Sequence, residues 1–284
     1  MAQNVREIKG RIGNIQDIAQ ITKAMNAIAM TKVTRMKRRL NASRPYIEAL
    51  TQFSRRLLGR LSSDVPPHPL TVPGTSSVTA VFVLNSDRGL CGRYKGDLNR
   101  ESEKRIHELG DQGRLIVGGE KARAFYARRD VEILDTYAHA YDQPTERIAA
   151  RIADELIARF ENGDVGRIEL MYMRFQSDLA QKLVVEPFLP VSIEAEPNND
   201  LIDPDADVML DAALRMLLHG TLYAAMIETK TSEDALRRQA MKAATDNAED
   251  LIKHLSRVYN KARQQAITRE IADIIGGAEA LRDA

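Results

Sequence analysis

Few residues in this chain of 284 could do chemistry on their own. The single cysteine, Cys91, lies in the glycine-flanked segment SDRGLCG (86–92), where a nucleophilic thiol would have room to react. No histidine lies near it in the sequence to take its proton. A tight turn, in which Gly89 and Gly92 adopt dihedrals that other residues avoid, explains the segment better than a catalytic thiol.

Motifs for phosphates, cofactors and metals are missing as well. Gly118 and Gly119 follow a predicted strand, but neither the G-x-G-x-x-G nor the G-x-x-x-x-G-K-[ST] spacing is present. The histidines are scattered, with no pair at the spacing of metal ligands: His68, His107, His139, His219 and His254. We therefore predict no catalytic residue, no cofactor and no metal ion on this chain.

Charge is balanced overall but unevenly distributed. The chain has 41 Lys and Arg against 40 Asp and Glu, a net charge of +1, which excludes a globally basic nucleic-acid binder. Residues 1–60 contain 13 basic and 3 acidic residues, so this segment carries +10 and the remainder −9. This asymmetry indicates a surface that meets an acidic partner, with a solvated helix face as the alternative.

Long helices are expected at both ends. Apolar or small residues recur at steps of three and four along residues 4–58, a helix of roughly 80 Å; they are Val5, Ile8, Ile12, Ile15, Ile18 or Ala19, Thr22, Met25 and Ala29. A second such series lies in the proline-free stretch 208–281, roughly 110 Å as a helix; it is Met241, Thr245, Ala248, Leu251 or Ile252, Leu255, Val258, Ala262, Ile267, Ile271 and Ile274. Since one globular core cannot cover such helices, we predict an antiparallel coiled coil of the two.

The middle of the chain has a different character. The proline-rich stretch 64–77 reads as a linker. After it, strands are predicted at 78–84, 115–119, 131–134, 168–175 and 183–191, and helices at 93–109, 120–129 and 144–161. This alternation predicts a mainly parallel sheet covered by helices. Pro187 and Pro190 favour an edge position for the last strand.

Three segments carry a resemblance to a known family. ITKAM (21–25), SDRGLCG (86–92) and the long run MKAATDNAEDLI (241–252) with YNKARQQAITREIADIIGGAEAL (259–281) resemble the gamma subunits of F-type ATP synthases. The resemblance spans the chain and implies a coiled coil of terminal helices with a central Rossmann-like α/β domain. The expected boundaries are 1–62 for the N-terminal helix, 63–77 for the linker, 78–200 for the α/β domain or foot, and 201–284 for the C-terminal helix.

The resemblance implies a central rotor stalk without a catalytic site of its own. Its partners would be the alpha and beta subunits of the catalytic hexamer, the epsilon subunit and the c-subunit ring of the membrane rotor. Contacts from shaft to ring are expected at Lys23, Met25, Arg237, Arg263, Gln264, Thr268 and Glu270. Contacts from foot to rotor ring are expected at Arg88, Gly89, Leu90, Cys91, Gly92 and Arg93.

Departures from the family pattern leave alternatives open. Arg93, Tyr94 and Lys95 follow GLCG where the family has a small residue, another residue and Asn, and NAIAMTKV (26–33) differs from the usual helix sequence. A sodium-translocating paralogue is one alternative. A basic-helix module for nucleic acid or an anionic membrane surface is a more distant one, although aromatic residues do not interleave with the basic residues.

Location follows from two absences in the sequence. No run of about 18 uncharged apolar residues is present, so we expect no membrane span. The cysteine-bearing insertion of chloroplast relatives is missing, and Cys91 alone could not form their redox switch. The resemblance then implies a bacterial protein, peripheral on the cytoplasmic side of the inner membrane through its complex.

Overall fold

The structure is a computed structural model that describes residues 2–60, 66–140, 142–198 and 206–282. The chain forms two compact units: unit 1 is Met1–Ile28 with Arg238–Ala284, and unit 2 is Ala29–Arg237. The division falls inside both long helices, since the C-terminal half of α1 and the N-terminal part of α5 belong to unit 2. The linker prediction falls partly on residues 61–65, which lie outside the described residues.

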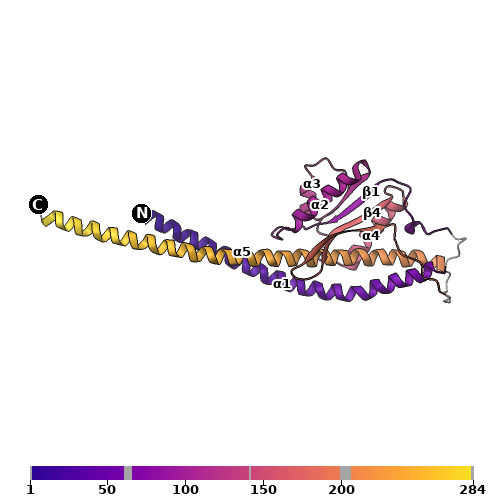
Figure 1. The fold of residues 1–284 in the computed structure, drawn as a ribbon, viewed down its shortest axis with the longest axis horizontal. Helices are drawn as coiled ribbons and strands as arrows, with labels where there is room; N and C mark the ends of the chain where they lie inside the picture. Colours follow the sequence, from indigo (N-terminus) through magenta and orange to yellow (C-terminus); the bar gives the residue numbers. More distant parts are fainter. Residues whose placement is uncertain (1, 61–65, 141, 199–205, 283–284) are drawn as a thin grey trace. The chain divides into compact units, whose positions relative to one another are not determined.

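Two long helices account for both ends of the chain (Figure 1). Helix α1 is Ala2–Leu58, 57 residues that include Pro45, and helix α5 is Ala206–Arg282, 77 residues. The ends of both helices lie within two residues of the predicted ones, since a sustained series of apolar residues at steps of three and four is the strongest helix signal in a sequence, even where it contains Pro45 or a glycine.

Unit 1 is the predicted antiparallel helix pair (Figure 1). Met241, Thr245 and Ala248 of α5 are buried, and Thr22 of α1 is buried with them. The Oγ1 atoms of Thr22 and Thr245 are 2.8 Å apart, and each hydroxyl also lies within hydrogen-bond distance of a carbonyl of its own helix, that of Ala19 or of Met241. This polar pair in an apolar seam joins the two helices at one fixed register.

The seam of α5 departs from its predicted path beyond Leu255. That residue is half-buried as expected, but Val258 is 39% exposed and Ile267 is 44% exposed. Tyr259 and Ala266 are half-buried instead. The side of α5 that is turned away from solvent passes from Leu255 to Tyr259, four residues on, and then through Ala262 to Ala266. Following the apolar side chains rather than the helix geometry gave the wrong residues there.

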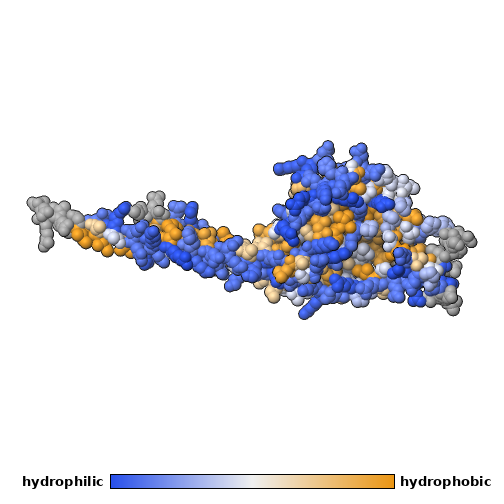
Figure 2. Space-filling model, viewed as in Figure 1, coloured by the Kyte–Doolittle hydropathy of each residue, from blue (hydrophilic) through white to orange (hydrophobic). Residues whose placement is uncertain are grey.

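The end of α5 exposes a row of isoleucines. Within the described side chains these are Ile267, Ile271, Ile274 and Ile275, between 44% and 67% exposed. Figure 2 shows apolar surface alternating with hydrophilic surface along this part of the helix. Ile271 and Ile274 had been expected in the helix–helix seam; their exposure leaves them available to another protein.

Unit 2 contains a five-stranded sheet in the order β3-β2-β1-β4-β5. Its strands are β1 Thr79–Leu84, β2 Gly113–Gly118, β3 Ile133–Tyr137, β4 Arg167–Phe175 and β5 Gln181–Leu189. The first four pair in parallel and β5 runs antiparallel at the edge, as the proline content of that segment predicts. The carboxyl ends of β1, β2 and β3 therefore meet at one edge of the sheet.

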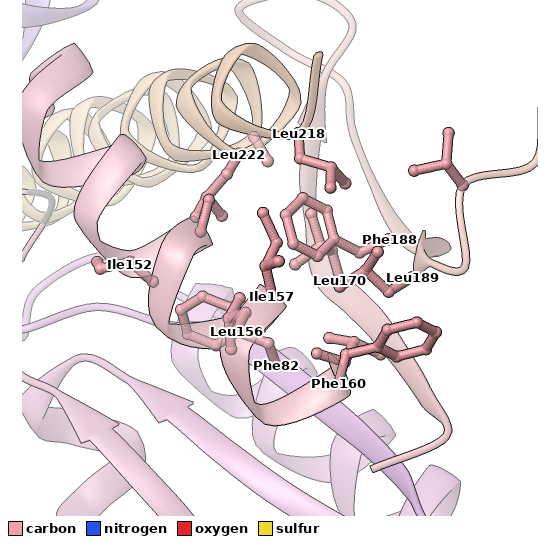
Figure 3. Packing of buried hydrophobic residues seen from close by; sticks show 14 of the residues in the cluster. Phe82, Ile152, Leu156, Ile157, Phe160, Leu170, Phe188, Leu189, Leu218 and Leu222 are labelled. Carbon is pink, nitrogen blue, oxygen red and sulfur yellow. The ribbon is translucent and has the colours of Figure 1, made fainter. Parts of the chain in front are cut away.

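Helices cover both faces of this sheet. Phe82 points to one face, where it packs with α4 (Glu146–Glu161) and α5 through residues such as Leu156 and Leu222 (Figure 3). Val81 and Val83 point to the other face, covered by α2 (Tyr94–Leu109) and α3 (Glu120–Tyr126). Every side chain of β1 is buried, so the loop that follows it starts from a fixed point. Short 3-10 turns, Pro69–Thr71 and Gly110–Gln112, complete the unit.

Candidate functional site

The segment SDRGLCG forms the loop between β1 and α2, at the carboxyl edge of the sheet. Its Asp87 side chain is 5% exposed, and one oxygen, Oδ1, accepts the backbone N–H groups of Glu120 and His139, each at 2.9 Å. A single carboxylate thus ties the loop after β1 to the start of α3 and to the loop after β3. This anchoring is strong because hydrogen bonds to a carboxylate are stronger than hydrogen bonds between neutral groups.

Cys91 and Leu90 lie oppositely in this loop. Cys91 is buried, with its Sγ 3.8 Å from Ser86 Oγ. Gly92 has the positive φ expected of a tight turn, whereas Gly89 does not, and the second positive φ of the turn falls on Leu90. Leu90 is 61% exposed and also has a positive φ, 60°, which a leucine adopts only at a cost. Arg88, Gly92 and Arg93 are exposed beside it.

Helix α5 passes beneath the loop with buried charges. The side chains of Lys230, Glu233 and Asp234 are 4%, 2% and 1% exposed, and Arg237 is 10% exposed. Lys230 Nζ lies 3.1 Å from Glu233 Oε2, and Arg237 pairs with both Glu233 and Asp234. Burial lowers the pKa of Lys230, but the surrounding carboxylates prevail and raise it, so Lys230 is charged at neutral pH.

Asp142 joins this cluster to the loop. Its Oδ1 accepts from Lys230 Nζ at 3.1 Å and its Oδ2 accepts from Arg88 Nη2 at 2.6 Å. Burial raises the pKa of Asp142, but Lys230 and Arg88 outweigh it and lower the pKa. We call Arg88, Asp142, Lys230, Glu233, Asp234 and Arg237 the ion cluster.

One bond in the cluster brings together residues expected at opposite ends of the rotor. Arg237 Nη2 donates to the backbone carbonyl of Gly89 at 3.4 Å. Arg237 was expected to contact the catalytic ring and Gly89 the membrane rotor ring, yet both belong to one local structure. Arg237 is also buried, and its hydrogen bonds are made within the chain.

The other expected shaft residues lie in unit 1. Lys23 is exposed and Met25 is half-buried on α1. Arg263, Gln264, Thr268 and Glu270 are exposed on α5. Thr268 Oγ1 donates to the Gln264 carbonyl at 2.9 Å, which aligns these two residues on one flank of the helix.

Sequence reasoning missed four members of the ion cluster: Asp142, Lys230, Glu233 and Asp234. On α5 they belong to the run ETKTSEDALRR (228–238), which is polar on all sides and would ordinarily be solvent-exposed. The available signal was the spacing of Lys230, Glu233, Asp234 and Arg237. Each of the two cations lies three and four residues from the two acids on one helix. Asp142 comes from a distant loop and had no signal.

Among the described residues, no group of three or more His, Cys, Asp or Glu side chains could hold a metal ion. A search of the same residues finds no helix long and apolar enough to cross a membrane. Fold and site together define a protein built on two long terminal helices. Buried ion pairs attach the loop after β1 to α5, and isoleucine side chains are exposed near the C-terminal end of α5.

Comparisons with known proteins agree with this class. The family described as ATP synthase matches residues 4–281. The ATP synthase gamma chain of Parafrankia sp. is 37% identical over 299 residues, covering 99% of each chain, and that of Mycobacterium marinum is 37% identical over the whole of both. The chain belongs to the ATP synthase gamma chain family, whose members form the central stalk of the rotary F-type enzyme.

Solved structures show the same fold. A chain of the Euglena gracilis mitochondrial ATP synthase superposes with a TM-score of 0.70 at 16% identity, covering 99% of this chain and 95% of that one. A chain of the Tetrahymena thermophila mitochondrial ATP synthase central stalk and c-ring superposes with a TM-score of 0.61 at 20% identity, covering 79% and 99%.

Proposed function

We propose that this chain transmits torque between a membrane rotor ring and a surrounding ring of alpha and beta subunits, and that it has no catalytic site of its own. The observation that carries the proposal is α5, one unbroken helix that supplies residues to both units. A turn imposed on unit 2 is therefore carried covalently into unit 1. The catalytic subunits respond if their conformers bind the shaft with different free energies.

Contacts with the alpha and beta ring are proposed for the exposed polar flank of unit 1. Arg263, Gln264 and Thr268 are free of the helix–helix seam, and Glu270, Lys23 and Met25 extend the set. An arginine desolvated at such an interface makes charge-assisted hydrogen bonds worth roughly 1.5–3 kcal/mol. The exposed isoleucines at the end of α5 supply apolar area to the same ring.

The loop at 88–93 is reassigned. Arg237, which holds Gly89, lies 31 residues after the start of α5 at Ala206, about 46 Å along a helix. It is also the last residue of unit 2 before the chain enters unit 1. We therefore propose that the loop lies on the side of the catalytic ring, and that the membrane rotor ring meets the opposite end of unit 2.

That opposite end is where α1 finishes and α5 begins. The carbonyl of Arg55 accepts hydrogen bonds from the backbone N–H groups of Gly59 and Glu196. The residue that follows α1 therefore packs closely against the segment between β5 and α5. A Cβ on Gly59 would lie 1.9 Å from the Glu196 carbonyl oxygen, so only glycine fits. We propose this region for the c-subunit ring, with the epsilon subunit beside it. The complex would place the chain peripherally on the cytoplasmic side of a bacterial inner membrane.

The basic N-terminal segment supports a protein partner over nucleic acid. Part of its charge is used within the chain: Lys37 pairs with Asp178, Arg39 donates to the Pro144 carbonyl, and Arg55 pairs with Glu194. The coupling ion is selected by other subunits, so a proton-translocating complex and a sodium-translocating complex would share this mechanism.

Reconstitution with alpha and beta subunits tests the proposal. Arg263→Ala with Gln264→Ala should reduce ATP turnover while assembly and melting temperature stay unchanged. The isolated chain should bind ATP no better than about millimolar, since no phosphate loop is present. Wild-type turnover by an assembled double variant, or micromolar ATP binding by calorimetry, would contradict the assignment.

A further inference from the structure

Two loops at the carboxyl edge of the sheet are held in costly backbone conformations. Among the described residues, the two non-glycine residues with positive φ are Leu90, at 60°, and His139, at 59°. They lie in the loop after β1 and the loop after β3, which Asp87 joins. Such conformations persist only where the surrounding structure imposes them, and they gather at functional segments.

Helix α5 contacts the loop after β1 through the ion cluster. The two oxygens of Asp142 bridge Lys230 of the helix and Arg88 of the loop, at 3.1 and 2.6 Å. Arg237 reaches the same loop at the carbonyl of Gly89. The loop is therefore bound to α5 at two neighbouring points, the Arg88 side chain through Asp142 and the Gly89 carbonyl directly.

The charges of α5 that hold the loop are buried, whereas the Arg88 end of the bridge is 65% exposed. A buried ion pair stabilises the folded state little more than well-packed apolar residues of the same volume. Its presence therefore indicates that it fixes the position of the loop more than it adds stability. The Asp142 carboxylate and the Arg237 guanidinium each demand directed partners, which fixes orientation as apolar contacts do not.

We propose that Asp142, Lys230 and Arg237 are positioning residues that lock the loop 86–93 onto α5, so that Leu90 is presented rigidly and loop and shaft turn as one body. This deepens the proposed function and rests on it, because a loop that slipped on the helix would lose torque. The exposed Leu90 is then a contact whose position, and not only its presence, matters.

A distance measurement on the isolated full-length chain tests the lock directly. Nitroxide labels are placed at Leu90→Cys and Met216→Cys, both exposed positions, in a Cys91→Ser background, and pulsed electron paramagnetic resonance gives the distance distribution. Asp142→Asn removes the bridging charge at a side chain 22% exposed; the width of the distribution should grow about twofold or more. Asp142→Glu should restore most of the narrow width.

Asp97→Asn is the matched control. Asp97 is also 22% exposed and pairs with two arginines, Arg93 and Arg100, but it makes no bond to α5. It should leave the width unchanged. Arg88→Met, at a side chain 65% exposed, removes the loop half of the bridge without opening the core and should also broaden the distribution. Equal widths for wild type, Asp142→Asn and Arg88→Met would overturn the proposal.

The assembled complex separates this proposal from the rotor assignment. With the lock weakened, Asp142→Asn should lower the number of ions pumped per ATP, whereas Asp97→Asn should not. Broadening with unchanged pumping would overturn the role of the lock in torque and leave the rotor assignment standing. Failure of the wild-type chain to assemble with alpha and beta subunits would count against the rotor itself.

Discussion

Replacing Lys230 by Met should destabilise unit 2 far more than the same change at a matched exposed lysine. Lys230 is 4% exposed and faces Glu233, Asp234 and Asp142, so its removal breaks three ion pairs and leaves Arg237 as the one buried cation beside Glu233 and Asp234. Breaking a buried ion pair costs about 3–5 kcal/mol. For a unit of about 150–250 residues, each kcal/mol lowers the melting temperature by about 2–4 °C, so a fall of about 6–20 °C is expected.

Lys104→Met is the control. Lys104 pairs with Glu101 and Glu108 at the same helical spacings, three and four residues away, but its side chain is 65% exposed. Exposed pairs contribute about 0–1 kcal/mol, so its melting temperature should change by less than about 4 °C. Near-ultraviolet circular dichroism during heating, at neutral pH and fixed salt, follows the packing of unit 2. Equal shifts for the two variants would refute the burial argument.

Three further predictions follow from specific contacts. A double-mutant cycle with Thr22→Val and Thr245→Val should give a coupling energy of about 0.5–1.5 kcal/mol in denaturant unfolding, and zero coupling would mean that the 2.8 Å contact does not form. Leu255→Asp should lower the melting temperature of the helix pair while Val258→Asp should not, since Leu255 is half-buried and Val258 is 39% exposed; the reverse order would place the seam wrongly. The pKa of Asp142 is lowered in the folded chain, so its contribution to the free energy of unfolding is complete above the unfolded pKa of about 3.9 and is lost as pH falls through the folded pKa. The difference in stability between wild type and Asp142→Asn should therefore disappear on acidification below pH of about 4. A difference independent of pH would contradict the ion pairs of Asp142.

The sequence predicted the fold well because periodicity reports directly on burial. The long helices, the parallel order of β1, β2 and β4 and the edge position of β5 follow from local patterns and from Pro187. The predicted seam was wrong at Val258 because this residue is apolar but does not lie on the buried side of the helix. Only the contacts in the structure show which side of the helix is buried.

The ion cluster was beyond local reasoning for a different reason. The polar run at 228–238 reads as solvent-exposed unless the loops that bury it are known, and Asp142 lies 88 residues from Lys230. The bond between Arg237 and Gly89 spans 148 residues and carries the proposal that the loop lies on the side of the catalytic ring. Such contacts are set by the sheet topology, which a single sequence indicates only in outline.

Rotation of the chain inside its complex is the most direct test of the central claim. A bead attached through Lys104→Cys, in a Cys91→Ser background, would report on unit 2 while the alpha and beta subunits are fixed to a surface. Addition of ATP should drive stepwise rotation in one direction, and the rotation should stop when ATP is removed. An assembled complex that hydrolyses ATP while the bead shows only undirected motion would contradict the account.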